Sequence, residues 1–334
     1  MKELFIMSAM LQMFAEDTHG FDMNTQTTET GGLSVEMKTY YSDYLIDNAK
    51  PNLVHDQFGQ KHAIPKNGGK TIEFRKFTPF SKATTPLVEG VTPDGGSLSV
   101  TNLTATVHQY GYYVTISDIL QLTSIDNTLV ETTKLLGGQA GSTLDTITRE
   151  VLNGGTSVMY SGGKEARKSL ADGDKLTVDD IFRAARFLKT QNAPKISGSY
   201  VAIIHPDVAY DLMRNEEWID VHKYSATTEI FEGEIGKIAG VRFVETTEAK
   251  IFAKGAGEKD VYSTLVLGAN AYGVTEVTGG GLQHIVKQLG SGGTADPLNQ
   301  RATAGWKAIK TAERLVENYM IRIESVSTFD SGEN

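Results

Sequence analysis

The chain has 334 residues, of which 40% are hydrophobic and 22% charged, so it has enough apolar surface for one large or two ordinary globular domains. It contains no cysteine, which excludes disulfides, thiolate metal sites and cysteine nucleophiles. No segment approaches the ~20 consecutive apolar residues of a membrane span. The formal net charge of -9, without a cluster of Lys and Arg, argues against a protein that grips nucleic acid.

The N-terminal region is interpreted as an arm followed by a helix. Residues 1–35 combine a short apolar segment with the polar run "TQTTETGG", which cannot pack into a core. Residues 36–59 predict a helix, interrupted near Lys50-Pro51, because a proline inside a helix removes a hydrogen bond and clashes with the preceding turn. Its apolar face is expected to carry Met37, Tyr41, Tyr44 and Leu45.

Two strands with a long connection follow. Residues 70–77, "KTIEFRKF", alternate as a strand with Ile72 and Phe74 on one face. Residues 100–116 are rich in Thr, Val and Tyr and predict a second strand. The connection 78–99 contains three prolines and three glycines, and a loop of that length inside a compact domain is usually functional or disordered. We expect a long hairpin that touches a neighbouring molecule.

A helical stretch comes next. Ser117-Asp118 is a plausible cap, and a first apolar stripe is formed by Ile119, Leu122, Ile125 and Leu129. A later stripe contains Ala140, Leu144, Ile147 and Val151. A helix over residues 127–152 would be about 39 Å long at ~1.5 Å per residue.

Beyond the glycine and serine residues of 154–163 the pattern changes to mixed helix and strand. Thr177 and Asp180 have the spacing of a capping box at the start of a helix with Ile181, Ala184, Ala185 and Leu188 on one face. Residues 199–205, "SYVAIIH", predict a buried strand, and Pro206 predicts the start of another helix. Residues 318–327, "NYMIRIESVS", alternate as a strand near the C-terminus. The fold class is therefore α+β.

Two glycine-rich segments could suggest nucleotide binding. In "GEIGKIAGVRFVETT", residues 233–247, a strand-like sequence follows Gly240, whereas a dinucleotide-binding loop opens a helix. We expect a two-residue turn at Ala239-Gly240, with Gly240 at positive φ. In "IPKNGGKT", Ile64 stands where a phosphate loop needs its first glycine, and a strand follows.

No set of residues predicts an active site. The seven histidines are scattered, none at metal-ligand spacing, and His205-Pro206-Asp207 is typical of a strand end and helix start rather than a catalytic pair. Trp306 is expected in a core or an interface. We predict no catalytic, cofactor-binding or metal-binding residue.

The order of these elements resembles the tailed-bacteriophage major capsid proteins of the Hong Kong 97-type fold. The resemblance is carried by the corner "IGKIAGVRFVETT" and by the segments "IIHPDVAYDLMRNEEW", "LVLGANAYGV" and "DPLNQRATAGWKAIKTAERLVENYMIRIES". It covers about residues 30–328. The family fold consists of an N-terminal arm, an extended E-loop hairpin, a P domain with a long spine helix, and an A domain.

The resemblance implies a division of this chain. Residues 1–35 would be the arm, 36–59 a helix leading to the E-loop, and 60–120 the E-loop with its tip at 78–99. Residues 121–177 and 291–334 would form the P domain with spine helix 127–153, and 178–290 the A domain. The candidates for contacts between subunits are Pro79, Lys82, Pro86, Glu89 and Pro93, and Gly240 is a structural turn.

The resemblance also implies a function without enzymatic chemistry. Such subunits self-assemble into hexamers and pentamers of an icosahedral shell that encloses double-stranded DNA, using heterologous contacts between neighbours. The implied partners are other copies of the chain, a separate scaffolding protein, a portal, and packaged DNA that is contacted weakly, with no membrane and no cofactor. The protein would be located in the virion capsid, after assembly in the cytoplasm of the host cell.

Two alternatives remain. An encapsulin-like nanocompartment would use the same fold to enclose an enzyme cargo. A cytoplasmic enzyme is possible if acidic residues or histidines that are distant in sequence converge in space. The oligomeric state of the expressed protein separates the shells from the enzyme.

Overall fold

The computed structural model of the chain describes residues 45, 47–49, 53–63, 70–77, 80–87, 89–92, 95–124, 128–219, 234–253, 259–275, 281–293 and 296–334. The chain forms two compact units, each made from three stretches of sequence. The first unit comprises Met1–Ala49, Gly111–Ala140 and Gln283–Lys307, and the second comprises Lys50–Tyr110, Gly141–Leu282 and Ala308–Asn334. The predicted arm 1–35 lies outside the described residues.

The second unit contains a seven-stranded mixed sheet. Its strand order is β5 (Val158–Tyr160), β15 (Met320–Val326), β10 (Val261–Leu267), β6 (Tyr200–Ile204), β8 (Val241–Glu245) and β7 (Glu234–Ile238), with β9 (Ile251–Phe252) paired to β10. The β5–β15 and β6–β8 pairs are parallel, and the β10–β15, β10–β6, β10–β9 and β7–β8 pairs are antiparallel. The sheet therefore joins segments that are far apart in sequence.

Both faces of this sheet are buried. Tyr200, Ala202 and Ile204 of β6 belong to one core cluster, whereas Ile203 belongs to another. Since consecutive strand residues point to opposite faces, a strand covered on both sides is continuously apolar, as predicted for residues 199–205. The C-terminal strand β15 is buried at every position, although its sequence alternates.

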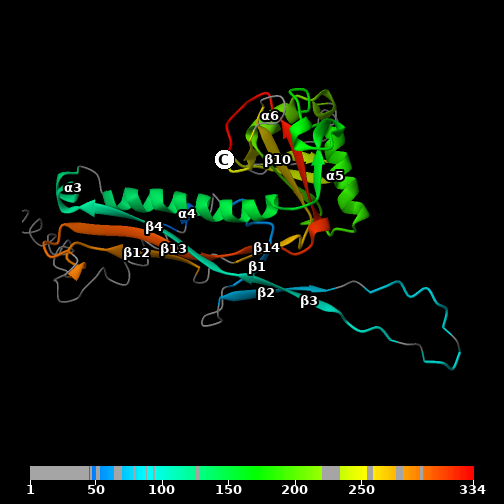
Figure 1. The fold of residues 1–334 in the computed structure, drawn as a ribbon, viewed down its shortest axis with the longest axis horizontal. Helices are drawn as coiled ribbons and strands as arrows, with labels where there is room; N and C mark the ends of the chain where they lie inside the picture. The colour runs from blue at the N-terminus through cyan, green and yellow to red at the C-terminus, as the bar shows by residue number, and fades with distance from the viewer. Residues whose placement is uncertain are drawn as a thin grey trace, which may run out of the picture. The chain divides into compact units, whose positions relative to one another are not determined.

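Two helices contribute to the first of these clusters. α5 (Val178–Thr190) begins with the predicted capping box, in which Thr177 and Asp180 exchange side-chain to backbone hydrogen bonds. Its predicted apolar face is buried. α6 (Pro206–Met213) begins at Pro206, as predicted, and Figure 1 shows both helices beside the sheet that contains β10.

The second cluster contains residues of a three-stranded sheet, together with Leu152 near the end of the long helix that is described below. Its strands are β1 (Gln60–His62), β11 (Tyr272–Thr275) and β14 (Ala312–Arg314). The segment before β1 differs from the prediction. Leu45 and Asp47–Ala49 are helical, but residues 55–58 form a turn, so the predicted helix does not continue to residue 59.

The predicted hairpin is present, with one correction. β2 (Thr71–Phe77) pairs antiparallel with β3 (Val100–Thr106), from Thr71 opposite Thr106 to Phe77 opposite Val100. The prediction of one strand over residues 100–116 is wrong, because the ladder breaks at Val107 and β4 (His108–Ser117) pairs elsewhere. Uniform β-propensity along the segment does not reveal a change of partner.

The first unit contains parts of a three-stranded sheet and of the long helix. The sheet order is β12 (Leu282–Lys287), β13 (Arg301–Lys310) and β4. The helix α4 (Thr128–Asn153) matches the predicted spine helix, and Figure 1 shows it alongside β4 and β13. The indole Nε1 of buried Trp306 donates to Gln139 Oε1 over 2.6 Å, which secures the sheet to the helix.

The predicted start of this helical stretch is a separate short helix, α3 (Asp118–Thr123). Ser117 caps it by accepting a hydrogen bond from the Leu120 amide, as predicted. The helix ends at Ser124, which has an extended conformation, and none of its residues is buried. Ile119 and Leu122 are therefore exposed rather than part of a core, and Ile125 lies outside the described residues. No helix in the described ranges is long and apolar enough to span a bilayer.

Candidate assembly surface

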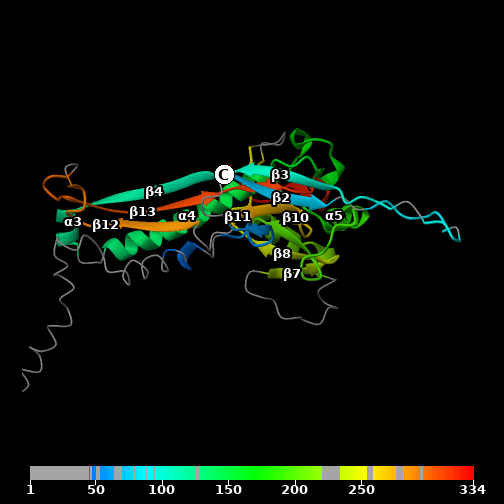
Figure 2. The same cartoon turned by 90° about the horizontal axis from the view of Figure 1, so that it is seen from below.

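The connection between β2 and β3 is the most exposed apolar feature of the second unit. Its described residues form neither helix nor strand, apart from local turns, and all are exposed. Figure 1 and Figure 2 show it continuing beyond the ends of the two strands. Its large apolar side chains are in contact with solvent, at Phe80, Leu87, Val91 and Leu98. A concentration of exposed apolar side chains in a folded protein marks an interaction site.

Three of the five predicted contact residues lie on the described part of this loop. Lys82, Pro86 and Glu89 are all exposed. Pro79 and Pro93 lie outside the described residues. The loop turns at Gly90, whose φ is +79°.

The base of the hairpin, in contrast, is anchored. Ile72 and Phe74 are buried with Ala105, as predicted from the alternation of β2, and Leu315 packs against them. The Val107 amide donates to the Lys70 carbonyl over 2.8 Å, which closes the base of the hairpin. A well-packed base that carries an exposed apolar loop is suited to present that loop to another molecule.

The corner at Gly240 is a tight hairpin turn. Ala239 and Gly240 connect β7 and β8 with φ values of +53° and +83°. Positive φ at both central residues is the geometry of a type I′ turn, which matches the twist of the flanking strands. The turn carries buried Ile238 and Val241 into the core, and the Gly240 carbonyl accepts from the Tyr200 amide over 2.9 Å. The positive φ of Ala239 is a difference from the prediction, which placed positive φ at Gly240.

A buried histidine and aspartate form a pair that sequence analysis missed. His55 Nδ1 lies 2.6 Å from Asp145 Oδ2, and the His55 amide donates to Asp145 Oδ1 over 2.7 Å. Both side chains are fully buried. The Tyr272 hydroxyl donates to the His55 carbonyl, and burial, with the nearby Asp56 and Asp145 charges, raises the pKa of Tyr272 well above its ordinary value.

A second buried pair adjoins it. Asp56 accepts from the Thr148 hydroxyl over 2.5 Å and forms an ion pair with Lys310. Together the two pairs fasten the turn 55–58 to α4 and β13. One feature of the sequence could have indicated these pairs. Asp145 and Thr148 lie within the buried face of α4, and a buried carboxylate needs a partner. The cluster is buried in the interior of the second unit.

A third ionic group joins three segments of the second unit. Fully buried Glu324 accepts from Arg167 Nε over 2.6 Å and from Arg322 Nε over 2.8 Å. The Arg167 guanidinium lies 3.5 Å from the centre of the Phe252 ring. The hydrogen bond to Glu324 raises the pKa of Arg167, whereas burial lowers the pKa of Arg322. All the charges are paired, which is the arrangement expected for a structural role.

His205 also has a structural role. Its Nδ1 accepts from the Asp207 amide over 3.2 Å and so caps α6. Burial lowers the pKa of His205, although the Asp207 charge opposes the shift. Across the described ranges, no group of three or more His, Cys, Asp or Glu side chains is placed to hold a metal ion.

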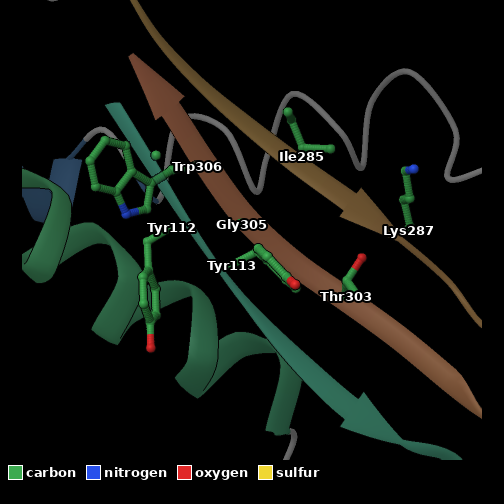
Figure 3. A pocket seen from close by; sticks show the side chains of 8 residues that line it. Tyr112, Tyr113, Ile285, Lys287, Thr303, Gly305 and Trp306 are labelled. Atoms are coloured by element: carbon green, nitrogen blue, oxygen red, sulfur yellow. The ribbon is translucent and has the colours of Figure 1, made fainter. Parts of the chain in front are cut away.

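The first unit contains a hollow of about 450 Å³ on the sheet formed by β4, β13 and β12. Figure 3 shows Tyr113 on β4 and Ile285 on β12 on either side of β13. Gly111 and Gly305 contribute no side chains to the lining, and the remaining lining residues are Tyr112, Lys287, Thr303 and Trp306. This hollow and the exposed loop both present apolar side chains at the surface of the described residues.

Comparison with known proteins identifies the family. The sequence pattern of the family described as phage capsid protein matches residues 120–292, more than half of the chain. Curated proteins include no match to the chain.

Solved structures show the same fold. The capsid of Ralstonia phage GP4 is 17% identical, with a TM-score of 0.66 over 84% of this chain and 90% of that chain. The capsid of cyanophage P-SCSP1u is 15% identical, with a TM-score of 0.62 over 83% and 89%. A virus-like particle from Pyrococcus furiosus is 11% identical, with a TM-score of 0.51 over 86% and 100%.

The predicted α+β fold and the predicted family are confirmed by these matches. The chain belongs to the phage capsid protein family and is a major capsid protein with the Hong Kong 97-type fold.

Proposed function

We propose that this protein assembles into hexamers and pentamers that close an icosahedral shell around double-stranded DNA, and that it performs no enzymatic chemistry. The observation that carries the proposal is the exposed apolar loop 80–99 on a buried base. Leu87 is 77% exposed in the single chain, and apolar surface of this kind is stabilised when another subunit covers it. The capsid structures of related fold support the same assignment.

The parts of the chain take the roles implied by the family. The segment 60–120 acts as the E-loop with tip 78–99, α4 as the spine helix, residues 121–177 and 291–334 as the P domain, and 178–290 as the A domain. A separate scaffolding protein and a portal complete the assembly in the host cytoplasm. The packaged DNA is contacted weakly, because the chain is net negative.

The loop is proposed to act as a clasp between neighbouring subunits. Its prolines restrict the free loop, so less conformational entropy is lost when the loop docks. A contact from the loop of one subunit to a different surface of the next is heterologous, and such contacts form rings when the rotation between subunits closes.

Deletion of residues 80–98 tests the clasp. The deletion leaves three residues between β2 and β3, a length that natural hairpins use, so the base should still fold. We expect a folded subunit by circular dichroism and no shells or rings by negative-stain electron microscopy. A full-length variant with Thr84→Ser and Thr85→Ser should assemble normally. Normal shells from the deleted chain would refute the clasp.

A shell without a genome is the second candidate, favoured by the likeness to the virus-like particle from Pyrococcus furiosus. The two candidates differ in their contents. Nuclease-protected double-stranded DNA in shells isolated from infected cells supports the phage capsid. A protein cargo at fixed stoichiometry in the same shells supports the compartment.

A further inference from the structure

We infer that four charged side chains at the C-terminal end of α4 set the direction of this helix relative to the seven-stranded sheet, and that this direction determines the diameter of the assembled shell. The four residues, which we call the helix-end clamp, are Arg314, Glu317, Arg322 and Glu324. The inference rests on the proposed function, because it identifies positioning residues for assembly.

The clamp supplies hydrogen bonds that the helix cannot make by itself, since the carbonyl groups of a last helical turn have no partners within the helix. Arg314 Nη1 donates to the Val151 carbonyl over 2.5 Å. Arg322 Nη1 donates to the carbonyl of Asn153, the last residue of α4. A positive charge at a helix C-terminus also interacts favourably with the helix dipole. The arginines come from β14 and β15, so strands of two different sheets hold the end of the helix.

Each arginine is held in turn by a carboxylate. Arg314 Nε donates to Glu317 Oε2 over 3.0 Å, and Glu317 Oε1 accepts from the Thr156 amide. Burial opposes ionisation of Glu317, but the hydrogen bond from Thr156 and the Arg314 charge outweigh it and lower the pKa of Glu317. Arg322 Nε donates to fully buried Glu324 over 2.8 Å. The guanidinium groups are therefore held in the positions from which they contact the helix.

Two glycines directly after α4 leave room for the clamp. A Cβ atom on Gly154 would lie 2.9 Å from Arg314 Nη1, and one on Gly155 would lie 2.8 Å from Glu317 Oε1. Neither glycine has a positive φ, so the backbone conformation does not require glycine at these positions. The feature that does require it is the close approach of the charged groups.

A polar side chain attaches the same turn of α4 to a third strand. Asn153 Oδ1 accepts from Ser263 Oγ over 2.5 Å, and Asn153 Nδ2 donates to the Arg149 carbonyl over 2.8 Å. Ser263 lies on β10, which pairs with β15. Attachments to three strands define a direction, whereas a single contact would let the helix pivot.

The direction matters because α4 is long. Its 26 residues span about 39 Å, so a tilt of about 10° would move the far end of the helix by about 7 Å. Heterologous contacts form closed rings only when the rotation between neighbours closes, and otherwise they form open helical assemblies. A change of this size in the subunit would therefore alter the curvature of the assembly.

The pair of Arg314 and Glu317 is suited to orientation rather than to stability. Its side chains are 28% and 31% exposed, and partly exposed ion pairs add little to stability. Loss of the pair should therefore leave a folded subunit in which α4 has a less defined direction. A residue with a purely structural role would instead change the stability of the subunit.

Arg314→Leu tests the clamp, because it removes both the hydrogen bond to α4 and the ion pair but keeps an apolar side chain. We expect shells of mixed diameter with open spirals or tubes, and a distribution of diameters roughly twofold broader than that of the wild type by negative-stain electron microscopy. The urea midpoint of the unassembled subunit should shift by less than about 0.5 M. Lys259→Leu, which breaks a pair of similar exposure with Asp330, is the matched control and should give shells of wild-type diameter.

Gly155→Ala disturbs the clamp without removing a charge, since the added methyl group displaces the Glu317 carboxylate. It should broaden the distribution of diameters as Arg314→Leu does, and it decides the question if Arg314→Leu does not fold. Gly173→Ala, where an added Cβ atom meets nothing within 4 Å, should have no effect. Shells of wild-type diameter from Gly155→Ala and from folded Arg314→Leu would overturn the inference.

Spin labels measure the direction of α4 itself, because the chain has no cysteine of its own. Leu135→Cys on α4 and Phe182→Cys on α5 place labels at two exposed positions of the unassembled subunit. Double electron–electron resonance should give a narrow distribution of distances with the intact clamp and a broader one with Arg314→Leu. An equally narrow distribution in both proteins would overturn the inference, whatever assemblies form.

The outcomes also separate this inference from the proposed function. Wild-type shells from all the variants leave the capsid role intact and exclude the clamp as a positioning group. A wild-type chain that never assembles, with a distance distribution that broadens in Arg314→Leu, contradicts the proposed function and supports the effect of the clamp on α4.

Discussion

At the scale of single residues, the buried ion pair of Asp56 and Lys310 shows how one charge depends on another. Lys310 is almost fully buried and pairs with Asp56, which also accepts a hydrogen bond from the Thr148 hydroxyl. Taking a charge out of water is costly, and the cost is offset only while the partner is present. The pair therefore specifies where the turn 55–58 attaches rather than adding a large net stability.

Asp56→Ala should lower the free energy of unfolding of the unassembled subunit by about 3–5 kcal/mol, because it leaves the Lys310 ammonium buried and unpaired. The urea midpoint measures the effect. Asp56→Asn combined with Lys310→Met should restore part of the loss. Asp179→Ala, which breaks an exposed pair with Arg183, should cost no more than about 0.5 kcal/mol. Equal effects of Asp56→Ala and Asp179→Ala would show that the buried pair has no special role.

Because residues 239 and 240 both have positive φ, substitutions at these two positions should change the stability of the subunit in opposite directions. Gly240→Val should destabilise the subunit by about 1–3 kcal/mol, because a β-branched residue strongly disfavours a φ of +83°. Ala239→Gly should stabilise it slightly, because Ala239 already has a positive φ that glycine adopts freely. Thermal unfolding of the two variants beside the wild type measures both signs, and a stable Gly240→Val subunit would exclude the turn as a structural requirement.

At the scale of elements, the C-terminal segment 327–334 is attached to the second unit by side chains instead of by a sheet ladder. Asp211 accepts from the Ser327 hydroxyl over 2.8 Å and from the Thr328 amide over 2.7 Å. Burial opposes ionisation of Asp211, but the hydrogen bonds from Thr328 and Ser327 and the Lys175 charge outweigh it and lower the pKa of Asp211 below its ordinary value. The attachment therefore depends on an ionised carboxylate.

This dependence predicts release of the segment in acid. Because the folded-state pKa is lowered, the contribution of Asp211 is fully present above the unfolded value of about 3.9 and is lost as the pH falls through the folded value. Hydrogen exchange of residues 327–329 should therefore quicken, relative to intrinsic rates, as the pH falls below about 4. Asp211→Asn should show fast exchange already at neutral pH and little further change in acid. Acid release that is the same in wild type and variant would exclude Asp211 as the cause.

At the scale of the whole molecule, the net charge of -9 limits what the shell can hold tightly. A protein that grips DNA neutralises phosphates with clustered Lys and Arg and releases counterions. Here basic residues are outnumbered, with 32 Lys and Arg against 41 Asp and Glu. We therefore expect a subunit with this charge balance to contact DNA weakly.

Double-stranded DNA should therefore bind weakly to the subunit and to assembled shells. We expect an affinity that changes less than tenfold between about 50 and 200 mM salt, whereas a protein making many phosphate contacts loses about 10³–10⁵ in affinity over that range. Fluorescence anisotropy with labelled DNA measures the dependence on salt. A steep loss of affinity with salt would contradict weak contact.

The sequence by itself determined the features whose cause lies within a few residues. The capping box of Thr177 and Asp180, the helix start at Pro206, the positive φ of Gly240 and the burial of Ile72 and Phe74 depend on local hydrogen bonds, local sterics and the period of the strand. The family and the fold followed from the order of such elements along the chain.

Only the tertiary structure decided which distant segments meet. The division of residues 100–116 into β3 and β4 depends on their different strand partners. His55 and Asp145 are 90 positions apart, and Asp56 and Lys310 are 254 apart, so no local pattern predicts either pair. The hollow between Tyr113 and Ile285 exists only because β4, β13 and β12 lie side by side in the sheet. Such contacts arise from the packing of the whole chain, which no short stretch of sequence encodes.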